Sequence, residues 1–432
     1  MAQSIDLLAD DLDAELASRI DGRIEAHAEH AFAFLERLVA APSTLGQEQE
    51  ALEILATELP GLGFVIERLP IPANVAALPG AGVPPLPYDG RYDIVARRKG
   101  ELEAPSLLLN GHIDVVPADE PGLWRDPPFN PVRRDGWLYG RGAGDMKCGF
   151  AMGVLALRAL LDAEVAAPLG PLTFVAAIEE ECTGNGTLAS VDADVVADAA
   201  VLLEPTDLDL LLGGVGILWL EITVAGRAAH AEAADSAVNA VEAASRLIPA
   251  LRTIEDELNV IGDPRIPTER PLHVNLGRLR GGDWPSSVPA SARLDVRVGY
   301  PPTWSAAEAE TWVRARIASA VSADPWLSQQ PPRVVANGFR AEGYDLAADH
   351  PLAVAMAAAH RDAHGREPRA RVMATTTDAR VYLRAGIPAI CYGPRTVRIH
   401  GIDEAVELAS IVAGARTLAR FLVGRARRAA DA

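Results

Sequence analysis

Apolar residues in the first half of the chain follow two alternating periods. Short apolar runs are typical of strands, whereas apolar residues spaced three and four apart are typical of helices with one buried side. The expected strands are Phe64–Leu69, Asp93–Arg97, Leu107–Asn110, Leu172–Ile178 and Ala200–Leu203. The expected helices are Ile24–Leu38, one that opens after Thr44 with Gln47 in a capping box and ends near Leu59, Gly149–Ala163 and Thr187–Ala199. This alternation predicts an α/β domain with a mixed, mostly parallel sheet and helices on both faces.

The pattern changes near Ile217. Strands are expected at Ile217–Ala225, Leu272–Arg280, Ala292–Gly299 and Arg333–Phe339, with helices at Ser236–Leu258 and Ala306–Ala323. This strand-helix-strand-strand-helix-strand order is typical of the split, ferredoxin-like α+β fold. A helix at Pro351–His364, a buried strand at Ala389–Tyr392 and a closing helix at Ala405–Arg425 complete the expected elements. We therefore expect a discontinuous domain of residues 1–215 and 336–432, interrupted by a second domain at 216–335.

The Pro/Gly-rich stretch between the first two strands predicts a surface excursion. At 432 residues the chain is long enough for two domains, and its formal charge of −19 disfavours a nucleic-acid partner. The three cysteines, Cys148, Cys182 and Cys391, form no C-x-x-C pair, so neither a disulfide framework nor a zinc ribbon is expected. The acidic N-terminal sequence has no secretory pattern and no apolar run is long enough to span a membrane, so a cytoplasmic location is expected.

Polar residues that suit metal binding stand at the ends of several expected strands or in the loops after them. His112 ends one strand, with Asp114 two residues on, where it could hold the other ring nitrogen. The further candidates are Asp145, the acidic residues 179–181, Glu204 and His400. In an open α/β sheet, ligands bind at the carboxyl ends of the strands. Two imidazoles with three carboxylates suit a pair of zinc-like ions. Such a pair would activate a water, so the sequence favours a metal-assisted hydrolase over a set of packed histidines and solvated acids.

Five segments resemble, in order, the signatures of one co-catalytic zinc family. They are GHIDVVP, GRGAGDMKCG, EEECTGNG, LEPT and GPRTVRIHGIDE, spread over about residues 105–405. The family is the aminoacylase/carboxypeptidase family that includes acetylornithine deacetylase and succinyl-diaminopimelate desuccinylase.

The resemblance implies a role for each candidate. It assigns five residues to two zinc ions, which cobalt could replace: His112 and Glu204 at one ion, Glu181 and His400 at the other, and Asp145 as the bridge. Asp114 would orient His112. The family usually has a glycine five residues after the last acidic residue, and Gly186 then makes Glu180 the general base and Glu181 the ligand. The other register, with Glu179 as base and Glu180 as ligand, stays open.

The resemblance also extends to the inserted domain and to the substrate. GRAAHAEAADSAVNA resembles a segment of a dimerisation or lid domain, so His230 would stabilise the oxyanion in the active site of a partner subunit. TTTDARVYL resembles a substrate loop in which Thr376, Thr377 and Arg380 would bind a carboxylate. In the inserted domain, the family usually has an asparagine in the loop before the lid proline, whereas here that loop reads DWPSSVPAS, with Ser286 and Ser287.

The expected function is removal of a small acyl group from an N-acylated amino acid, by a homodimer. The same metal set would also serve a dipeptidase or carboxypeptidase, an N-carbamoyl-amino-acid hydrolase or a formylaminopyrimidine deformylase, and the sequence does not choose the acyl group or the amine. A different class of function is also open: the chain could be a regulatory or binding protein that has kept the fold and lost catalysis. The complete set of candidate ligands argues against it.

Overall fold

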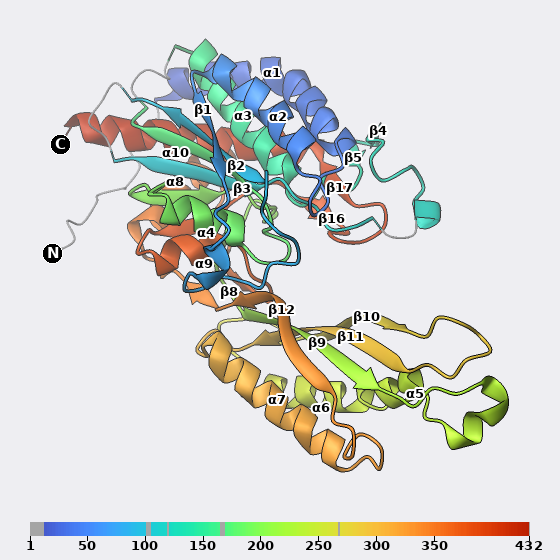
Figure 1. Cartoon of the computed structure of the whole chain (residues 1–432). Helices are drawn as coiled ribbons and strands as arrows, with labels where there is room; N and C mark the ends of the chain where they lie inside the picture. The colour runs from blue at the N-terminus through green and yellow to red at the C-terminus, as the bar shows by residue number, and fades with distance from the viewer. Residues whose placement is uncertain (1–12, 101–104, 119–120, 165–168, 267, 432) are drawn as a thin grey trace.

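A computed structural model describes residues 13–100, 105–118, 121–164, 169–266 and 268–431. The chain forms two bodies, a larger one built on a nine-stranded sheet and a smaller one built on a four-stranded sheet (Figure 1). The smaller body consists of one continuous segment, drawn in yellow-green to orange, and the remaining chain on both sides of it forms the larger body (Figure 1). In the described part of the chain, no helix combines the length and apolar character that crossing a membrane requires.

The large sheet has parallel strands at its centre and antiparallel strands towards both edges. Its order is β1-β2-β6-β3-β7-β15-β8-β13, and β14 pairs with β8. The strands are β1 (Val65–Pro70), β2 (Tyr92–Arg98), β3 (Leu107–His112), β6 (Leu172–Ala177), β7 (Ala199–Leu202), β8 (Leu210–Gly214), β13 (Tyr344–Asp345), β14 (Ala370–Met373) and β15 (Ala389–Cys391). Since β6, β3, β7 and β15 pair in parallel, their carboxyl ends meet at one edge. The predicted mixed sheet is confirmed.

Helices cover both faces of this sheet because its central strands are buried on both sides. Along β3, Leu107 and Leu109 pack into one apolar core and Leu108 into the other. The first core is covered by α1 (Ala14–Ala40), α2 (Gln49–Glu58), α3 (Lys147–Asp162), α8 (Pro351–His364) and α10 (Leu408–Asp431). The second is covered by α4 (Asn185–Asp192) and α9 (Ala379–Arg384).

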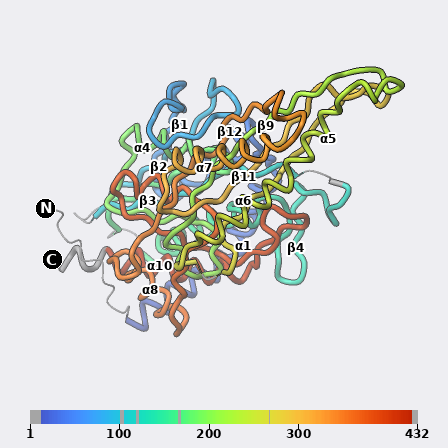
Figure 2. The backbone as a smooth tube through the Cα atoms, turned by 90° about the horizontal axis from the view of Figure 1, so that it is seen from below, coloured from blue at the N-terminus to red at the C-terminus, as the bar shows by residue number. Residues whose placement is uncertain are grey.

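The small sheet has the strand order β10-β11-β9-β12, which is the order of the expected ferredoxin-like pattern. Its strands are β9 (Gly216–Ala225), β10 (Val274–Gly281), β11 (Ser291–Tyr300) and β12 (Arg333–Ala341). The helices α5 (Ala240–Ser245), α6 (Ile248–Ile261) and α7 (Ala306–Ser322) cover one face, while the other face is turned towards the larger body (Figure 1). Around α5, a yellow-green segment projects beyond the sheet in both views (Figures 1 and 2).

The junction between the bodies differs from the expected division at residue 335. Strand β12 continues its pairing with β9 as far as Ala341. We therefore propose that the inserted unit comprises residues 216–341. The Pro/Gly-rich stretch lies largely at the surface, as expected, but it is anchored: Val75 and Tyr88 are buried, and Val83 forms a two-way backbone bridge with Gly338 of β12. This stretch links the two bodies, which alternation within one segment could not reveal.

Several helix boundaries differ from the prediction. The capping box at Thr44 is absent, and α2 begins at Gln49 after Glu48, whose side chain makes no cap hydrogen bond. The helix expected at Ser236–Leu258 is divided because Pro249 fits the first turn of α6 and not a helix interior. The helix expected at Thr187–Ala199 ends at Asp192, and the one expected at Ala405 begins after a short strand, β17 (Ala405–Glu407).

The strands that the sequence did not predict are two to five residues long, which is too short to display a period. They include β8, β13 and β14 of the large sheet. The others form a third sheet, of order β16-β17-β5-β4, in which β17 pairs with β16 (Thr396–Val397) and β5 (Trp137–Tyr139), and β5 pairs with β4 (Val132–Arg134). This sheet joins the loops that carry Asp145 and His400.

Candidate metal centre

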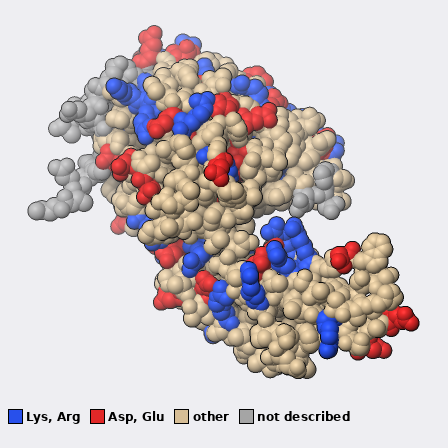
Figure 3. Space-filling model, in the orientation of Figure 1, with Lys and Arg blue, Asp and Glu red and all other residues tan. Residues whose placement is uncertain are grey.

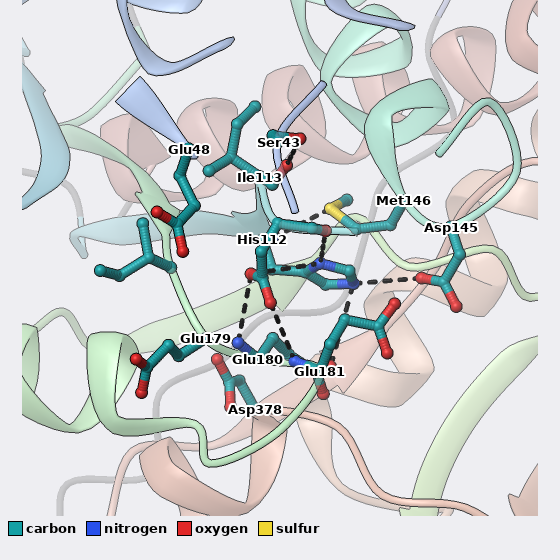
Figure 4. A network of polar contacts seen from close by, with 12 residues as sticks. Ser43, Glu48, His112, Ile113, Asp145, Met146, Glu179, Glu180, Glu181 and Asp378 are labelled. Carbon is teal, nitrogen blue, oxygen red and sulfur yellow. Dashed lines mark hydrogen bonds and ion pairs between the residues drawn. The ribbon is translucent and has the colours of Figure 1, made fainter. Parts of the chain in front are cut away.

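The carboxyl edge of the central parallel strands brings together most of the predicted site. His112 ends β3, the acidic loop of residues 179–181 follows β6, and Glu204 follows β7. Two loops close over this edge: one leads into α3 and carries Asp145, and the other lies between β16 and β17 and carries His400. Figure 4 shows His112 in the middle, with Asp145 to one side and the acidic loop below.

His112 is buried and directed by a main-chain oxygen. Its Nδ1 lies 2.9 Å from the carbonyl oxygen of Asp114. Since a carbonyl can only accept a hydrogen bond, Nδ1 donates, and the lone pair of the neutral ring is on Nε2. Nε2 lies 3.1 Å from Asp145 Oδ1, 3.9 Å from Glu204 Oε2 and 4.0 Å from Glu180 Oε2.

The carboxylate of Asp114 does not make the expected hydrogen bond to His112, since Oδ1 is 3.7 Å from Nδ1. It accepts instead from the main-chain N–H groups of Glu180, at 3.2 Å, and Glu181, at 3.1 Å. Asp114 thus orients the ring through its carbonyl group and the acidic loop through its side chain.

Asp145 connects the two histidines. Its Oδ1 faces His112, and its Oδ2 lies 3.3 Å from His400 Nε2. His400 Nε2 is also 3.0 Å from Glu181 Oε2. Candidate ligand atoms of His112, Asp145 and Glu181 all lie within 4.8 Å of one another. His112 therefore has two glutamates within 4.0 Å, His400 has Glu181, and the two imidazoles share one aspartate.

The electrostatics of the cluster suit a cation. Burial opposes charge on His112, but Glu204, Asp145 and Glu180 raise its pKa well above the ordinary value, and Glu181 raises the pKa of His400 to about 11. Burial raises the pKa of Glu204 to about 8 and that of Glu180 well above its usual range. Within the described ranges, neither Lys nor Arg forms an ion pair with these glutamates or with Glu181. The residues therefore fit divalent metal ions, which would supply the positive charge that the cluster lacks.

Glu179 faces away from the cluster (Figure 4). Its buried carboxylate forms an ion pair with Arg91 and accepts hydrogen bonds from Tyr88 at 2.6 Å and Thr183 at 2.8 Å. The residue has φ of +64°, a left-handed conformation that turns the chain between β6 and the next two glutamates. Arg91 and Tyr88, which the sequence analysis missed, belong to the linking stretch and hold this turn.

Glu404 is a second residue that the sequence analysis missed. It is fully buried, and its Oε1 accepts from the main-chain N–H groups of Gly142 at 3.0 Å, Gly144 at 2.8 Å and Asp145 at 2.9 Å. Its Oε2 pairs with Arg141. Because Glu404 lies four residues after His400, it ties the two ligand-bearing loops together. It stands inside a quoted motif, but nothing in its spacing indicates these main-chain partners.

The predicted substrate residues lie beside the acidic loop rather than within the cluster. Arg380 is buried and already engaged: Nη1 donates to Thr377 O and Nη2 to Thr183 O, both at 3.0 Å. Thr377 Oγ1 lies 2.6 Å from the hydroxyl of Tyr344. Thr376 Oγ1 is buried without a hydrogen-bond partner among the described residues. Of these three side chains, Thr376 has the free polar atom.

His230 is not brought to the cluster in this chain. It caps the exposed 3-10 helix η4 (Ala231–Ser236) on the projecting segment, where its Nδ1 accepts from Glu232 N at 3.1 Å. The loop with Ser286 and Ser287 lies alongside, through a hydrogen bond from Ala231 N to Ser286 O of 2.9 Å. Both predicted elements therefore share the far end of the small body.

Comparison with known proteins agrees with this arrangement. A model of peptidase family M20/M25/M40 matches residues 108–423. The chain is 31% identical to a succinyl-diaminopimelate desuccinylase of a Methylobacterium species, covering 88% of this chain and 92% of the relative. It is 27% identical to the N-formyl-4-amino-5-aminomethyl-2-methylpyrimidine deformylase of Halalkalibacterium halodurans, covering 78% and 83%.

The structure is similar to that of the dipeptidase Dug1p from Saccharomyces cerevisiae. The TM-score is 0.79 at 14% sequence identity, covering 95% of this chain and 98% of the other. That similarity concerns the fold. The match to the family extends from the strand that ends in His112 to the last helix, and the chain belongs to peptidase family M20/M25/M40.

Proposed function

We propose that this protein is a dizinc deacylase that removes a small acyl group from an N-acylated amino acid. The observation that carries the proposal is the position of Asp145, whose two oxygens face two different histidines. We assign His112 and Glu204 to one ion, Glu181 and His400 to the other, and Asp145 to both. Zinc in such a pair supplies a nucleophilic water at neutral pH and polarises a carbonyl group, and cobalt can serve in its place.

Glu180 is the general base in this proposal. Glu179 is occupied by Arg91 and Tyr88, and Glu181 contacts His400, whereas the nearest cationic neighbour of Glu180 is His112 at 4.0 Å. Its main chain is fixed by Asp114, and burial raises the pKa of its carboxyl group. A base with a raised pKa can take a proton from the attacking water and return it to the leaving amine.

The remaining roles concern the substrate. Thr376, with its unpartnered buried hydroxyl, would donate to a substrate carboxylate, and Thr377 and Arg380 would support the loop beside it. His230 stabilises the oxyanion in the site of a second subunit, since its own chain keeps it exposed on the projecting segment. The proposed protein is therefore a homodimer that assembles through the small body, and it works in the cytoplasm.

A substrate panel tests the function. Metal-loaded protein is assayed with N-acetyl, N-succinyl, N-formyl and N-carbamoyl amino acids, with dipeptides and with a formylated aminopyrimidine. We expect hydrolysis of at least one N-acyl amino acid in preference to the dipeptides. Faster hydrolysis of dipeptides would identify a peptidase instead, and hydrolysis of none together with no bound metal would indicate a binding protein.

Glu180→Gln tests the register. The variant should lose about 10²–10⁴-fold in kcat, because proton transfer is removed, while its metal content stays that of the parent protein. Glu179→Gln is the matched control, and it should lose stability through Arg91 with a smaller effect on kcat. If Glu180→Gln released a metal ion and retained activity, the register with Glu179 as base would be correct.

A further inference from the structure

The helix-free face of the small sheet carries a concentration of arginines. Along β11, Ala292, Leu294 and Val296 are buried against the helices, so the residues between them lie on the open face. The arginines of this face are Arg278 and Arg280 on β10, Arg293 and Arg297 on β11, and Arg333 on β12. Its carboxylates are Glu221 and Asp295. The face is therefore basic within a chain whose formal charge is −19.

The outermost row that crosses all four strands of this face consists mainly of arginines. Arg280 stands directly opposite Arg293, which is opposite Thr223, which is opposite Arg333. Like charges directly across neighbouring strands destabilise a sheet. The row therefore has a cost to folding that an anion on this face would relieve.

The nearby carboxylates neutralise only part of the charge. Arg278 pairs with Asp295 at 2.7 Å, and Arg293 pairs with Glu221 at 3.0 Å. Arg280 and Arg333 are exposed and make no ion pair with any residue in the described ranges. Two guanidinium groups are thus left open to solvent.

The face is continuous with the proposed substrate loop. Arg297, on the row nearest the junction, donates to Ala374 O at 3.3 Å, two residues before Thr376. Figure 3 shows basic side chains gathered on the side of the small body that is turned towards the larger one, which carries the metal centre. Arginines therefore extend from the substrate loop outwards along the sheet.

We propose that this open face attracts and orients substrates that carry carboxylates, and that Arg280 and Arg333 increase the preference of the enzyme for acyl groups with an additional carboxylate. This inference rests on the proposed function. A low-dielectric surface of one sign raises the local concentration of the opposite charge, and small ions are captured faster as a result. Arginine also matches a carboxylate through two parallel hydrogen bonds.

The test is a double variant, Arg280→Gln/Arg333→Gln. Its kcat/KM is measured for an N-succinyl and an N-acetyl derivative of the same amino acid at low and high salt. We expect the ratio of succinyl to acetyl kcat/KM to fall about three- to tenfold at low salt, and the difference to disappear at about 0.5 M salt, where the Debye length is only a few ångströms.

Arg252→Gln/Arg270→Gln is the matched control, since it removes the same charge from the small body near α6, away from the open face. An unchanged ratio in the first variant, or an equal change in the control, would overturn the inference. Succinate binding to the metal-loaded protein, measured by calorimetry, is independent of turnover and should weaken at least about threefold in the first variant only. If succinate binding behaves so while no amide is hydrolysed, the proposed function fails and the anion-attracting face stands.

Discussion

The two bodies place charged groups in opposite ways where they face each other. At the edge of the large sheet, most charged groups are buried and paired, as Glu404 is with Arg141, although the side chain of His400 is half-exposed. On the open face of the small sheet, Arg280 and Arg333 are exposed and have no carboxylate partner among the described residues. Buried charges interact strongly with their neighbours and are screened little, whereas exposed charges act through water and are screened by salt.

This comparison also separates two kinds of sequence signal. The buried cluster requires particular residue types at particular positions, and it appears as motifs. The open face requires only many positive charges on one side of a sheet, and any of several positions serves. The sequence analysis accordingly found the first and did not find the second.

The largest expected effect is at the residue that joins the two histidines. Asp145→Asn removes the negative charge shared by His112 and His400 while it keeps the size of the side chain. We expect loss of at least one metal equivalent, measured by elemental analysis, and a fall in kcat/KM of about 10³-fold or more. Full metal content with near-normal activity would show that Asp145 does not bridge the ions.

The ion pair beneath the cluster comes next. Arg141→Met leaves the buried carboxylate of Glu404 without its partner, and breaking such a pair costs about 3–5 kcal/mol. The free energy of unfolding, measured with denaturant on the metal-free protein, should fall by that amount. Arg37→Met, which removes a half-exposed arginine from the buried Glu58, is the control and should cost less because His30 and Arg158 also hold that carboxylate.

Glu404→Gln should have a smaller effect that is specific to metal binding. Glutamine keeps one oxygen for the three N–H groups of the Asp145 loop but loses its charge towards Arg141. Residues that orient metal ligands are typically worth about 10–100-fold in metal affinity. Competition with a chelator should show this loss, and Glu58→Gln, a buried and paired carboxylate of the helical layer, should bind metal as the parent protein does.

A large part of the site could be predicted because a residue at the end of a strand takes its position from the sheet. His112, the acidic loop and Glu204 follow parallel neighbours, so their proximity comes from the sheet alone. Asp145 and His400 stand in loops, where the sequence marked them as candidates, and the resemblance to a family supplied their separate roles. The prediction of a hydrolase of this family is confirmed by the match over residues 108–423.

What the sequence did not reveal depends on contacts between distant segments. Glu404 acts through main-chain N–H groups, which have no residue identity to recognise. Arg91 reaches Glu179 across 88 positions of the chain, from a stretch whose prolines and glycines indicated only turns. Short strands such as β13 are held by their partners rather than by their own composition.

The smallest expected effect is on the open face. Arg278→Gln removes an ion pair with Asp295 that is open to water, and exposed pairs contribute about 0.2–1 kcal/mol. The free energy of unfolding should therefore change by less than about 1 kcal/mol, and the change should vanish at high salt. Since Arg278 also stands among like charges, its loss lowers the repulsion that Arg280 and Arg293 experience, which offsets the lost pair further. A fall in the free energy of unfolding as large as that expected for Arg141→Met would mean that Arg278 is part of a buried, tightly packed network. The contrast between the two bodies would then be wrong.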